Sequence, residues 1–293
     1  MNKRELGGQI ALNIVFIILS ALIIVPFLLL VAVSITAESD ITKYGYQLIP
    51  HNIDFSAYMY IFKTPKMILD AYKITFAFSV VKMVLAVLLM SMIAYPLTKR
   101  EFKGKSAISF YLYFTMLFGG GLVPTYILIT QYLHLKNSFW VYVLPGMISP
   151  WYVFMIRTFF QGLPYEISEA ALIDGADEYQ IFARIIIPLS KPVLATVALF
   201  MFLGMWNDWN TSMLYITEEH LYSLQYMLQR IMENINMLKE MQKQGVMLTG
   251  AIDVPSETMR MAMAVVVAGP ALIVFPFFQK YFVKGLTVGS VKG

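Results

Sequence analysis

The stretch EAALIDGADEYQIFARIIIPLSKP, from Glu169 to Pro192, places charged residues and a glycine between two long apolar runs. Pro164, a few residues upstream, suits the first turn of a helix, because its missing N–H would have no helical partner there. Gly175 can adopt the left-handed backbone conformation that commonly follows the last residue of a helix. The sequence therefore predicts a short first helix that begins at Pro164 and ends at Gly175.

A second helix is expected directly after this corner. Asp177 is a favoured N-cap residue, and Gln180 stands three residues later, at the position of a capping-box partner. Pro188 and Pro192 should end or kink the second helix, because proline lacks the N–H that a helix interior needs. Residues 161–192 are thus expected to form a compact polar helix-turn-helix.

The composition of the chain is that of a polytopic membrane protein. Of its 293 residues, 58% are hydrophobic and only 14% are charged, whereas a soluble domain carries about 25% charged residues. The net charge of +4 suits basic loops at an anionic membrane surface better than nucleic-acid binding, which needs clustered Lys and Arg. Cysteine is absent, which excludes a disulfide framework and thiolate metal sites.

Six apolar segments are long enough to cross a lipid bilayer, which takes about 20 residues of helix. They are Ile10–Ile35, Ala71–Leu97, Ala107–Gln131, Phe139–Phe160, Val193–Met213 and Met261–Val283. The sequence GGGLVP interrupts the third segment. The predicted fold is therefore all-α, a single polytopic membrane domain over residues 1–293 with six transmembrane helices. The helix-turn-helix of residues 161–192 lies between the fourth and the fifth.

Lysine and arginine near the ends of these segments predict the orientation, since basic residues favour the cytoplasmic side. They gather before the first span, after the second and after the last, at Lys3, Arg4, Lys99, Arg100, Lys103, Lys105, Lys280, Lys284 and Lys292. All of them lie on one face if both termini are cytoplasmic. Residues 161–192 are then cytoplasmic, and the loop 214–260 is extracytoplasmic.

The helix-turn-helix has the character of a docking element. Its first helix offers carboxylates at Glu169 and Asp174, and the small Ala170 and Ala171 allow another surface to approach closely. Apolar side chains within 181–186 recur at helical spacing and should pack the second helix onto the span ends. Such an element can dock into a soluble protein and carry its motion into the membrane. The alternative is an amphipathic connector that lies on the membrane surface.

The residue order closely resembles the E-A-A-x-x-x-G signature of binding-protein-dependent ABC import permeases. The resemblance continues in AYPLTKREFKGK, FGGGLVPTYILI, FLGMWNDWN and FPFFQKYFVKGLTVGSVKG, which look like the sugar-importing, maltose-type (MetI-like) branch. GGGLVPTY and LYSLQYMLQRI resemble its oligosaccharide subgroup. The resemblance implies a coupling helix, docking on the ATP-binding subunit, that is formed by Glu169, Ala170, Ala171, Asp174 and Gly175.

The resemblance also implies the partners and the location. They are a second homologous permease subunit, two ATP-binding subunits, an extracytoplasmic solute-binding protein, a carbohydrate substrate and the bilayer of a bacterial cytoplasmic membrane. The chain has no G-x-x-x-x-G-K-[ST] motif, so ATP and Mg²⁺ are expected on the partner ATPases, with no cofactor in this chain. Its histidines, His51, His134 and His220, are far apart in sequence, so neither a metal site nor a catalytic centre is expected.

The sequence WNDWN at the outer end of the fifth span is a candidate for the substrate path. Aromatic faces at Trp206 and Trp209 can stack on sugar rings, while Asn207 and Asp208 can bond hydroxyl groups. A carboxylate at this depth needs water or a partner. The alternative is a belt of aromatic residues at the membrane interface, where tryptophan is common.

Three further residues are candidates for the same path. Lys82 lies within the second span, and a charge there marks a functional site by default. It could reach the headgroups, pair with Asp208, bond a carbonyl near Gly120, or line a water-filled cavity. The Gly-rich stretch around Gly120 should be locally unwound or closely packed. Tyr126 follows this stretch and is either a ligand contact or a packing residue.

Rival functions remain open at this point. The long outer loop, expected to form an external helix, either contacts the solute receptor or serves as a lid. A secondary transporter should show internal repeats and paired intramembrane charges, which this sequence lacks. An importer of peptides or amino acids is the alternative within the family, and the C-terminal FVKGLTVGSVKG favours sugar.

Overall fold

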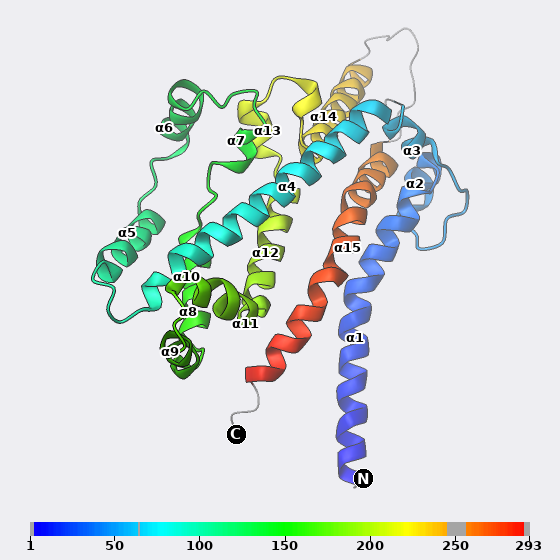
Figure 1. Cartoon of the computed structure of the whole chain (residues 1–293). Helices are drawn as coiled ribbons and strands as arrows, with labels where there is room; N and C mark the ends of the chain where they lie inside the picture. The colour runs from blue at the N-terminus through cyan, green and yellow to red at the C-terminus, as the bar shows by residue number, and fades with distance from the viewer. Residues whose placement is uncertain (1–2, 64, 245–255, 290–293) are drawn as a thin grey trace. The chain divides into compact units, whose positions relative to one another are not determined.

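The computed structural model of the chain describes residues 3–63, 65–244 and 256–289 (Figure 1). Every named element within these ranges is helical, and the one short extended pairing described is a bridge between Thr36 and Ile53. The expected all-α class is confirmed. The chain divides into two compact units, Met1–Ile68 with Leu228–Pro270 and Leu69–Met227 with Ala271–Gly293.

The first unit holds the long helix α1 (Lys3–Ser34), the short helices α2 (Glu38–Tyr44) and α3 (Ser56–Ile61), and the beginning of α15 (Ser256–Gly289). The carboxylate of Glu38 accepts bonds from the backbone N–H groups of Glu257 and Thr258, each at 3.0 Å. A carboxylate is favourable at this point because the first N–H groups of a helix lack intrahelical partners and carry partial positive charge. Glu38 thus holds the start of α15.

Helix α1 exposes large apolar side chains along most of its length, among them Leu12, Phe16, Ile23 and Leu28. The stretch Leu12–Ser34 is long and apolar enough to cross a bilayer. An exposed apolar surface of this extent is expected to face hydrocarbon or another membrane helix rather than water.

The second unit begins with most of α4 (Pro65–Ala94) and continues through a series of shorter helices. These are Pro96–Thr98, α5 (Lys105–Leu117), α6 (Leu122–Ile127), Leu128–Tyr132, α7 (Trp140–Val143), α8 (Pro150–Gln161), α9 (Tyr165–Ile173), α10 (Glu178–Ile181), Phe182–Ile186, α11 (Ile187–Leu189), α12 (Lys191–Trp206), α13 (Asn210–Tyr215) and Glu219–Leu221, followed by the start of α14 (Leu224–Lys243). Its core contains a close stack of Phe78 on Tyr142, with ring centroids 4.2 Å apart and nearly parallel planes.

The six predicted spans are only partly visible as continuous helices. Among the described residues, Leu12–Ser34, Pro65–Thr98 and Glu257–Val274 are long and apolar enough to cross a membrane. Two bent pairs could supply two more: Lys105–Leu117 with Leu122–Tyr132, bent by 112°, and Glu178–Leu189 with Lys191–Trp206, bent by 77°.

The expectation of one continuous helix over Phe139–Phe160 is wrong. Helix α7 ends at Val143, and α8 begins only at Pro150. Between them, Gly146 has a left-handed backbone with φ of 64°, which ends the regular helix. Pro145 lies within this break and Pro150 follows it, and hydropathy alone does not reveal the break because the residues around it are mostly apolar.

The predicted interruption of the third span is confirmed. Gly121 has φ of 82°, and the chain turns sharply between α5 and α6. A Cβ atom at Gly119 or Gly121 would meet nothing within 4 Å, and one at Gly120 would meet only Pro124 at an ordinary distance of 3.7 Å. Within this chain, the glycines therefore serve the backbone turn and not close helix packing. The external helix expected in the loop 214–260 is α14, and residues 245–255 of that loop lie outside the described residues.

Candidate functional site

The first half of the segment 161–192 forms as expected. Helix α9 starts directly after Pro164 and ends at Ile173. Gly175 has φ of 84°, its N–H donates to the carbonyl of Leu172 at 3.0 Å, and the N–H of Ala176 donates to Ala171 at 2.9 Å. This pair of bonds is a Schellman motif, which requires a left-handed residue at the corner. The prediction for Gly175 is confirmed.

The second half also begins as expected. A side-chain oxygen of Asp177 accepts the N–H of Gln180 at 2.7 Å, so Asp177 is the N-cap of α10. The helix continues through a wider π-helical turn at 182–186 and then α11, which contains Pro188. The sharp bend of 77° follows α11, before α12. The predicted kink is confirmed, and Pro188 lies just before it.

The tip of the element is less polar than the sequence indicates. Glu169, Ala170 and Asp174 are exposed, and Ala171 is half-buried. Beside them, Ile173 and Tyr179 are each 81% exposed. An exposed apolar side chain ringed by carboxylates is typical of a surface that another protein covers. The expectation of a purely polar tip is therefore corrected: α9 and the start of α10 present a mixed face.

The root of the element packs into the second unit as predicted. Ile181 is fully buried, and Ile186 is 6% exposed. The ring of Phe182 lies 5.2 Å from the ring of Tyr95, which follows the end of α4. The second helix of the segment is thus anchored, while α9 projects from it.

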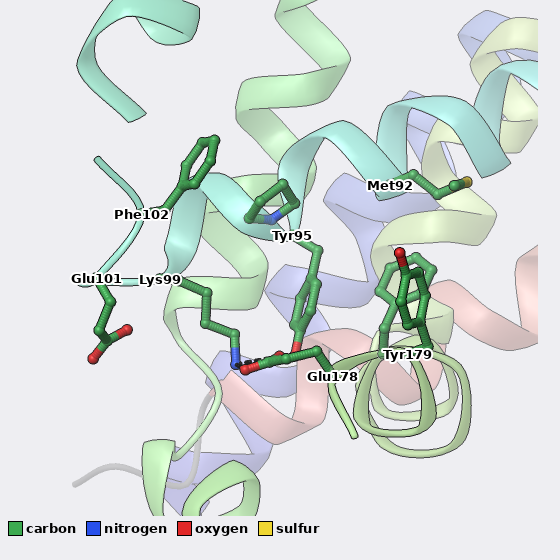
Figure 2. A pocket seen from close by; sticks show the side chains of 9 residues that line it. Met92, Tyr95, Lys99, Glu101, Phe102, Glu178 and Tyr179 are labelled. Carbon is green, nitrogen blue, oxygen red and sulfur yellow. Dashed lines mark hydrogen bonds and ion pairs between the residues drawn. The ribbon is translucent and has the colours of Figure 1, made fainter. Parts of the chain in front are cut away.

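An ionic contact that sequence reasoning missed fixes this root (Figure 2). The ammonium of Lys99 lies 2.8 Å and 3.0 Å from the two carboxylate oxygens of Glu178. The hydroxyl of Tyr95 donates to the same carboxylate at 2.5 Å. Lys99 also lies over the ring of Tyr95, 4.8 Å from its centroid, a cation–π distance. From the sequence, Lys99 indicates only the orientation, because nothing local connects it to Glu178.

The surroundings of this contact keep Lys99 charged. Burial acts to lower the pKa of Lys99, but the hydrogen bond to Glu178 and the contact with Tyr95 outweigh burial and raise the pKa above its ordinary value. An open pocket of about 540 Å³ lies beside the contact, and Met92 and Phe102 supply part of its apolar wall.

The residues proposed for a substrate path lie in different environments. Trp206 is buried, with its ring 5.8 Å from Phe202 and 6.3 Å from Tyr72, so in this structure it is a packing residue. Asn207 and Trp209 are exposed. Asn207 accepts a bond from Gln225 at 3.0 Å. The four residues of the motif therefore do not share one face.

Lys82 is buried, and its ammonium donates to the carbonyl of Pro145 at 2.8 Å. The carboxylate of Asp208 instead accepts bonds from the backbone and hydroxyl of Thr211, at 3.0 Å and 2.6 Å. The hydrogen-bond partner of Lys82 in this structure is therefore the Pro145 carbonyl and not Asp208 or a carbonyl near Gly120. The physical reason is the break between α7 and α8, which frees a carbonyl from the helical pattern and offers it to the charge.

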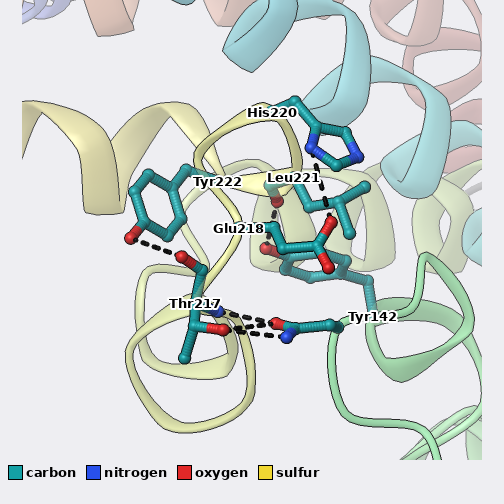
Figure 3. Close-up of polar contacts among 7 residues, drawn as sticks. Tyr142, Thr217, Glu218, His220, Leu221 and Tyr222 are labelled. Atoms are coloured by element: carbon teal, nitrogen blue, oxygen red, sulfur yellow. Dashed lines mark hydrogen bonds and ion pairs between the residues drawn. The ribbon is translucent and has the colours of Figure 1, made fainter.

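A hydrogen-bonded network joins the loop before α7 and the residues after α13 in the second unit (Figure 3). Asn137 adopts a left-handed backbone with φ of 54°, and its side chain bonds the backbone and hydroxyl of Thr217. The hydroxyl of Tyr142 contacts Ser212 and donates to the carbonyl of Leu221 at 2.8 Å. Close to these loops, Tyr126 stacks on Tyr215 at 5.6 Å, which agrees with a packing role.

Comparison with known proteins gives one consistent result over nearly the whole chain. Protein LplC of Bacillus subtilis is 37% identical over 93% of this chain and 90% of its own length. The polygalacturonan/rhamnogalacturonan transport system permease protein YtcP of the same organism is 34% identical over 95% of this chain and 96% of its own.

A solved structure shares the fold. It is the crystal structure of a bacterial ABC transporter involved in the import of the acidic polysaccharide alginate. One of its chains matches with a TM-score of 0.78 and 25% identity, over 96% of this chain and 99% of that chain. Residues 7–288 match the family model described as the binding-protein-dependent transport system inner membrane component. The chain therefore belongs to the family of inner-membrane permease components of binding-protein-dependent ABC transport systems.

Proposed function

We propose that this chain is the permease subunit of an ATP-driven importer that moves an oligosaccharide across the cytoplasmic membrane. The observation that carries the proposal is the full-length likeness to a permease named for polygalacturonan and rhamnogalacturonan. The fold shared with a chain of the alginate importer supports the same substrate class. Permeases of this family provide a gated path and are not catalytic themselves.

We infer a topology of six spans with both termini in the cytoplasm. The bent pair α5–α6 then contributes the third crossing, α7 with α8 forms a broken fourth crossing, and α12 contributes the fifth. Broken helices are tolerated at membrane depth where protein or a polar cavity covers the free backbone groups. In this arrangement, residues 1–293 form one transmembrane domain, 161–192 are cytoplasmic, and 214–260 face the outside.

The cytoplasmic segment is proposed to dock on an ATP-binding subunit. The mixed face of α9, with exposed Glu169 and Asp174 beside Ile173, supports this because carboxylates supply direction and an apolar side chain supplies affinity. The small side chains of Ala170 and Ala171 allow a partner to approach α9 closely, and Gly175 sets the angle between α9 and α10. ATP and Mg²⁺ are proposed to bind to two such subunits and not to this chain.

The remaining partners follow from the same assembly. A second, homologous permease completes the pore, and an extracytoplasmic solute-binding protein delivers the sugar to the outer loop 214–260. ATP binding closes the ATPase pair, α9 moves with it, and the spans alternate between inward and outward openings. Asn207, Asp208, Trp209 and Tyr126 are proposed to border the path, with Trp206 packed behind them, Lys82 bracing the broken fourth span and Gly120 permitting the turn in the third.

Two measurements test the proposal. The tagged chain is purified from membranes of its own cells, and its copurifying proteins are assayed for ATP hydrolysis with and without the solute-binding protein and oligogalacturonides. We expect an ATP-binding subunit to copurify and its hydrolysis to be stimulated. In parallel, deletion of the gene should abolish uptake of labelled oligogalacturonides, and wild-type chain should restore it. If no ATPase copurifies, the importer class is refuted. If an ATPase copurifies and the solute-binding protein stimulates it, but deletion of the gene leaves oligogalacturonide uptake unchanged, only the proposed substrate is refuted.

A further inference from the structure

The contact between Lys99 and Glu178 joins two elements that are distant in sequence and have different proposed tasks. Lys99 follows the end of α4, the helix proposed as the second span, and Glu178 opens α10, the second helix of the cytoplasmic segment. The side chain of Lys99 is only 17% exposed. An ion pair whose cation is largely shielded from solvent holds its geometry better than a fully exposed pair.

The joint does not depend on one interaction. The same carboxylate receives the hydroxyl of Tyr95 at 2.5 Å, while Lys99 lies over the ring of Tyr95 and Phe182 lies beside that ring at 5.2 Å. The bidentate ion pair restricts rotation of Glu178, and the ring contacts restrict the approach of the two backbones. Together these contacts define both the distance and the angle between α10 and the end of α4.

The other end of α10 is connected to α9 through a rigid corner. The two Schellman bonds at Gly175 and the N-cap at Asp177 leave few free torsions between the two helices. A displacement of α9 therefore turns α10 with it. The joint at Glu178 passes that rotation to Tyr95, which directly follows α4, and to Lys99, which lies beyond the short turn Pro96–Thr98.

We propose that Tyr95, Lys99 and Glu178 form a rigid joint that transmits the motion of the cytoplasmic segment to α4. They act as positioning residues, which touch neither ATP nor the transported solute. This inference rests on the proposed function, because it takes α9 as the element that the ATPase moves. It adds α4 to α8 and α12, the helices that directly precede and follow the segment, as a transmembrane helix that receives the motion.

The test uses the assembled transporter in proteoliposomes, with solute uptake and ATP hydrolysis measured on the same sample. Lys99→Glu and Glu178→Lys should each keep the ATP-binding subunit bound and hydrolysing, while the solute moved per ATP falls by at least about fivefold, the lower end of ordinary coupling between sites. The double variant Lys99→Glu with Glu178→Lys should recover most of the loss, because the pair is restored in reverse. Lys103→Glu is the matched control, since Lys103 is an exposed lysine of the same loop.

The outcomes separate this inference from the proposed function. Uptake per ATP equal to wild type in both single variants, together with loss of coupling in Gly175→Val, would overturn the joint and leave the docking proposal intact. An equal loss of uptake per ATP in the two single variants and in the double variant would also overturn the joint. The identity of the residue at each position, and not the ion pair, would then determine coupling. Wild-type coupling in Gly175→Val would instead refute the docking proposal itself.

A covalent link tests whether the joint stays closed. The chain contains no cysteine, so Lys99→Cys with Glu178→Cys introduces a unique pair within it. Bridging the pair with a bis-methanethiosulfonate reagent of matching length should restore the uptake per ATP that the two substitutions reduce. Arrest of uptake by the bridge, with the unbridged double variant still active, would show that the joint must open during transport and would overturn rigidity.

Discussion

Substitution of Gly175 offers a graded test of the proposed docking role of the segment 161–192. The backbone at this corner has φ of 84°, a conformation that glycine adopts freely and L-residues adopt at a cost. A Cβ atom added here would meet nothing within 4 Å, so no steric clash with neighbours contributes. Within this chain, the effect of adding a Cβ atom therefore comes from the backbone conformation.

The magnitudes follow from that conformation. Alanine in the left-handed region costs about 1–2 kcal/mol, which lowers the population of the native corner by roughly 5–30-fold. Asparagine tolerates the region better, because its short polar side chain can bond locally. Valine is β-branched and a true outlier there, so its cost reaches about 3 kcal/mol, on the order of a hundredfold in population. The expected order of coupling is Gly175, then Asn, Ala and Val.

The assay is ATP hydrolysis stimulated by the solute-binding protein, alongside uptake by the same reconstituted complex. Gly45→Val is the matched control, because Gly45 has φ of 73° and equally open surroundings but lies in the first unit. It should lower stability while leaving the ratio of uptake to hydrolysis unchanged. Wild-type stimulation in Gly175→Val, or the same loss in all three Gly175 variants, would refute the reasoning, as would uncoupling by Gly45→Val.

Three other substitutions test contacts of the individual units. Lys82→Leu removes a buried charge that costs about 2.5–3.5 kcal/mol in the membrane, but it leaves the Pro145 carbonyl without a partner at a cost of about 1–3 kcal/mol. Thermal stability should therefore change little, while uptake is altered. Adding Asp208→Asn should rescue nothing, and rescue would contradict the bond to Pro145. Asn137→Ala removes its bonds to Thr217 and places alanine at positive φ, so limited proteolysis should cut the outer loop faster, and unchanged cleavage would argue against the network. Glu38→Gln should lower the melting temperature by weakening the charge at the start of α15, an effect of about 0.3–1 kcal/mol, whereas Asp70→Gln, a change at an exposed surface pair, should not; equal melting of both variants would refute the role of Glu38.

The backbone of the segment 161–192 could be predicted residue by residue because its structure is local. Pro164, Gly175, Asp177 and Gln180 each act on backbone groups within a few residues, so their chemistry is legible in sequence order. The exposed apolar side chain of Ile173 escaped prediction for the opposite reason. Its environment depends on what the folded chain fails to cover, which no local pattern records.

Contacts between distant elements lay beyond prediction. The Lys99–Glu178 pair joins residues that periodicity treats independently, and each alone resembles an ordinary loop charge. Trp206 was assigned to a substrate path from residue type, yet its orientation on α12 buries it. The break after α7 does have a local signal in the sequence, since Pro145 and Gly146 interrupt a run that is otherwise mostly apolar.

The contacts of helix α4 give a physical reason for a buried lysine, Lys82, within a membrane segment. From its first turn to Ala94 it contains no glycine or interior proline, whereas the segments after it are broken repeatedly. Along about 30 Å of helix rise from Thr75 to Tyr95, it makes polar contacts with four later parts of the same unit: Thr75 with Leu224, Lys82 with Pro145, Met90 with Ser149, and Tyr95 with Glu178.

Such contacts are needed because apolar packing in lipid does little to select one orientation of neighbouring helices. Two of them, at Lys82 and Met90, bond backbone groups at the two ends of the break between α7 and α8, where the chain has no helical partners of its own. A side chain without a hydrogen-bond donor at position 82 would leave the Pro145 carbonyl without this bond. The bond to the Pro145 carbonyl therefore offsets the energetic cost of burying the charge of Lys82. A continuous fourth helix would not offer this carbonyl. Helix α4 and the broken pair α7–α8 thus stabilise each other.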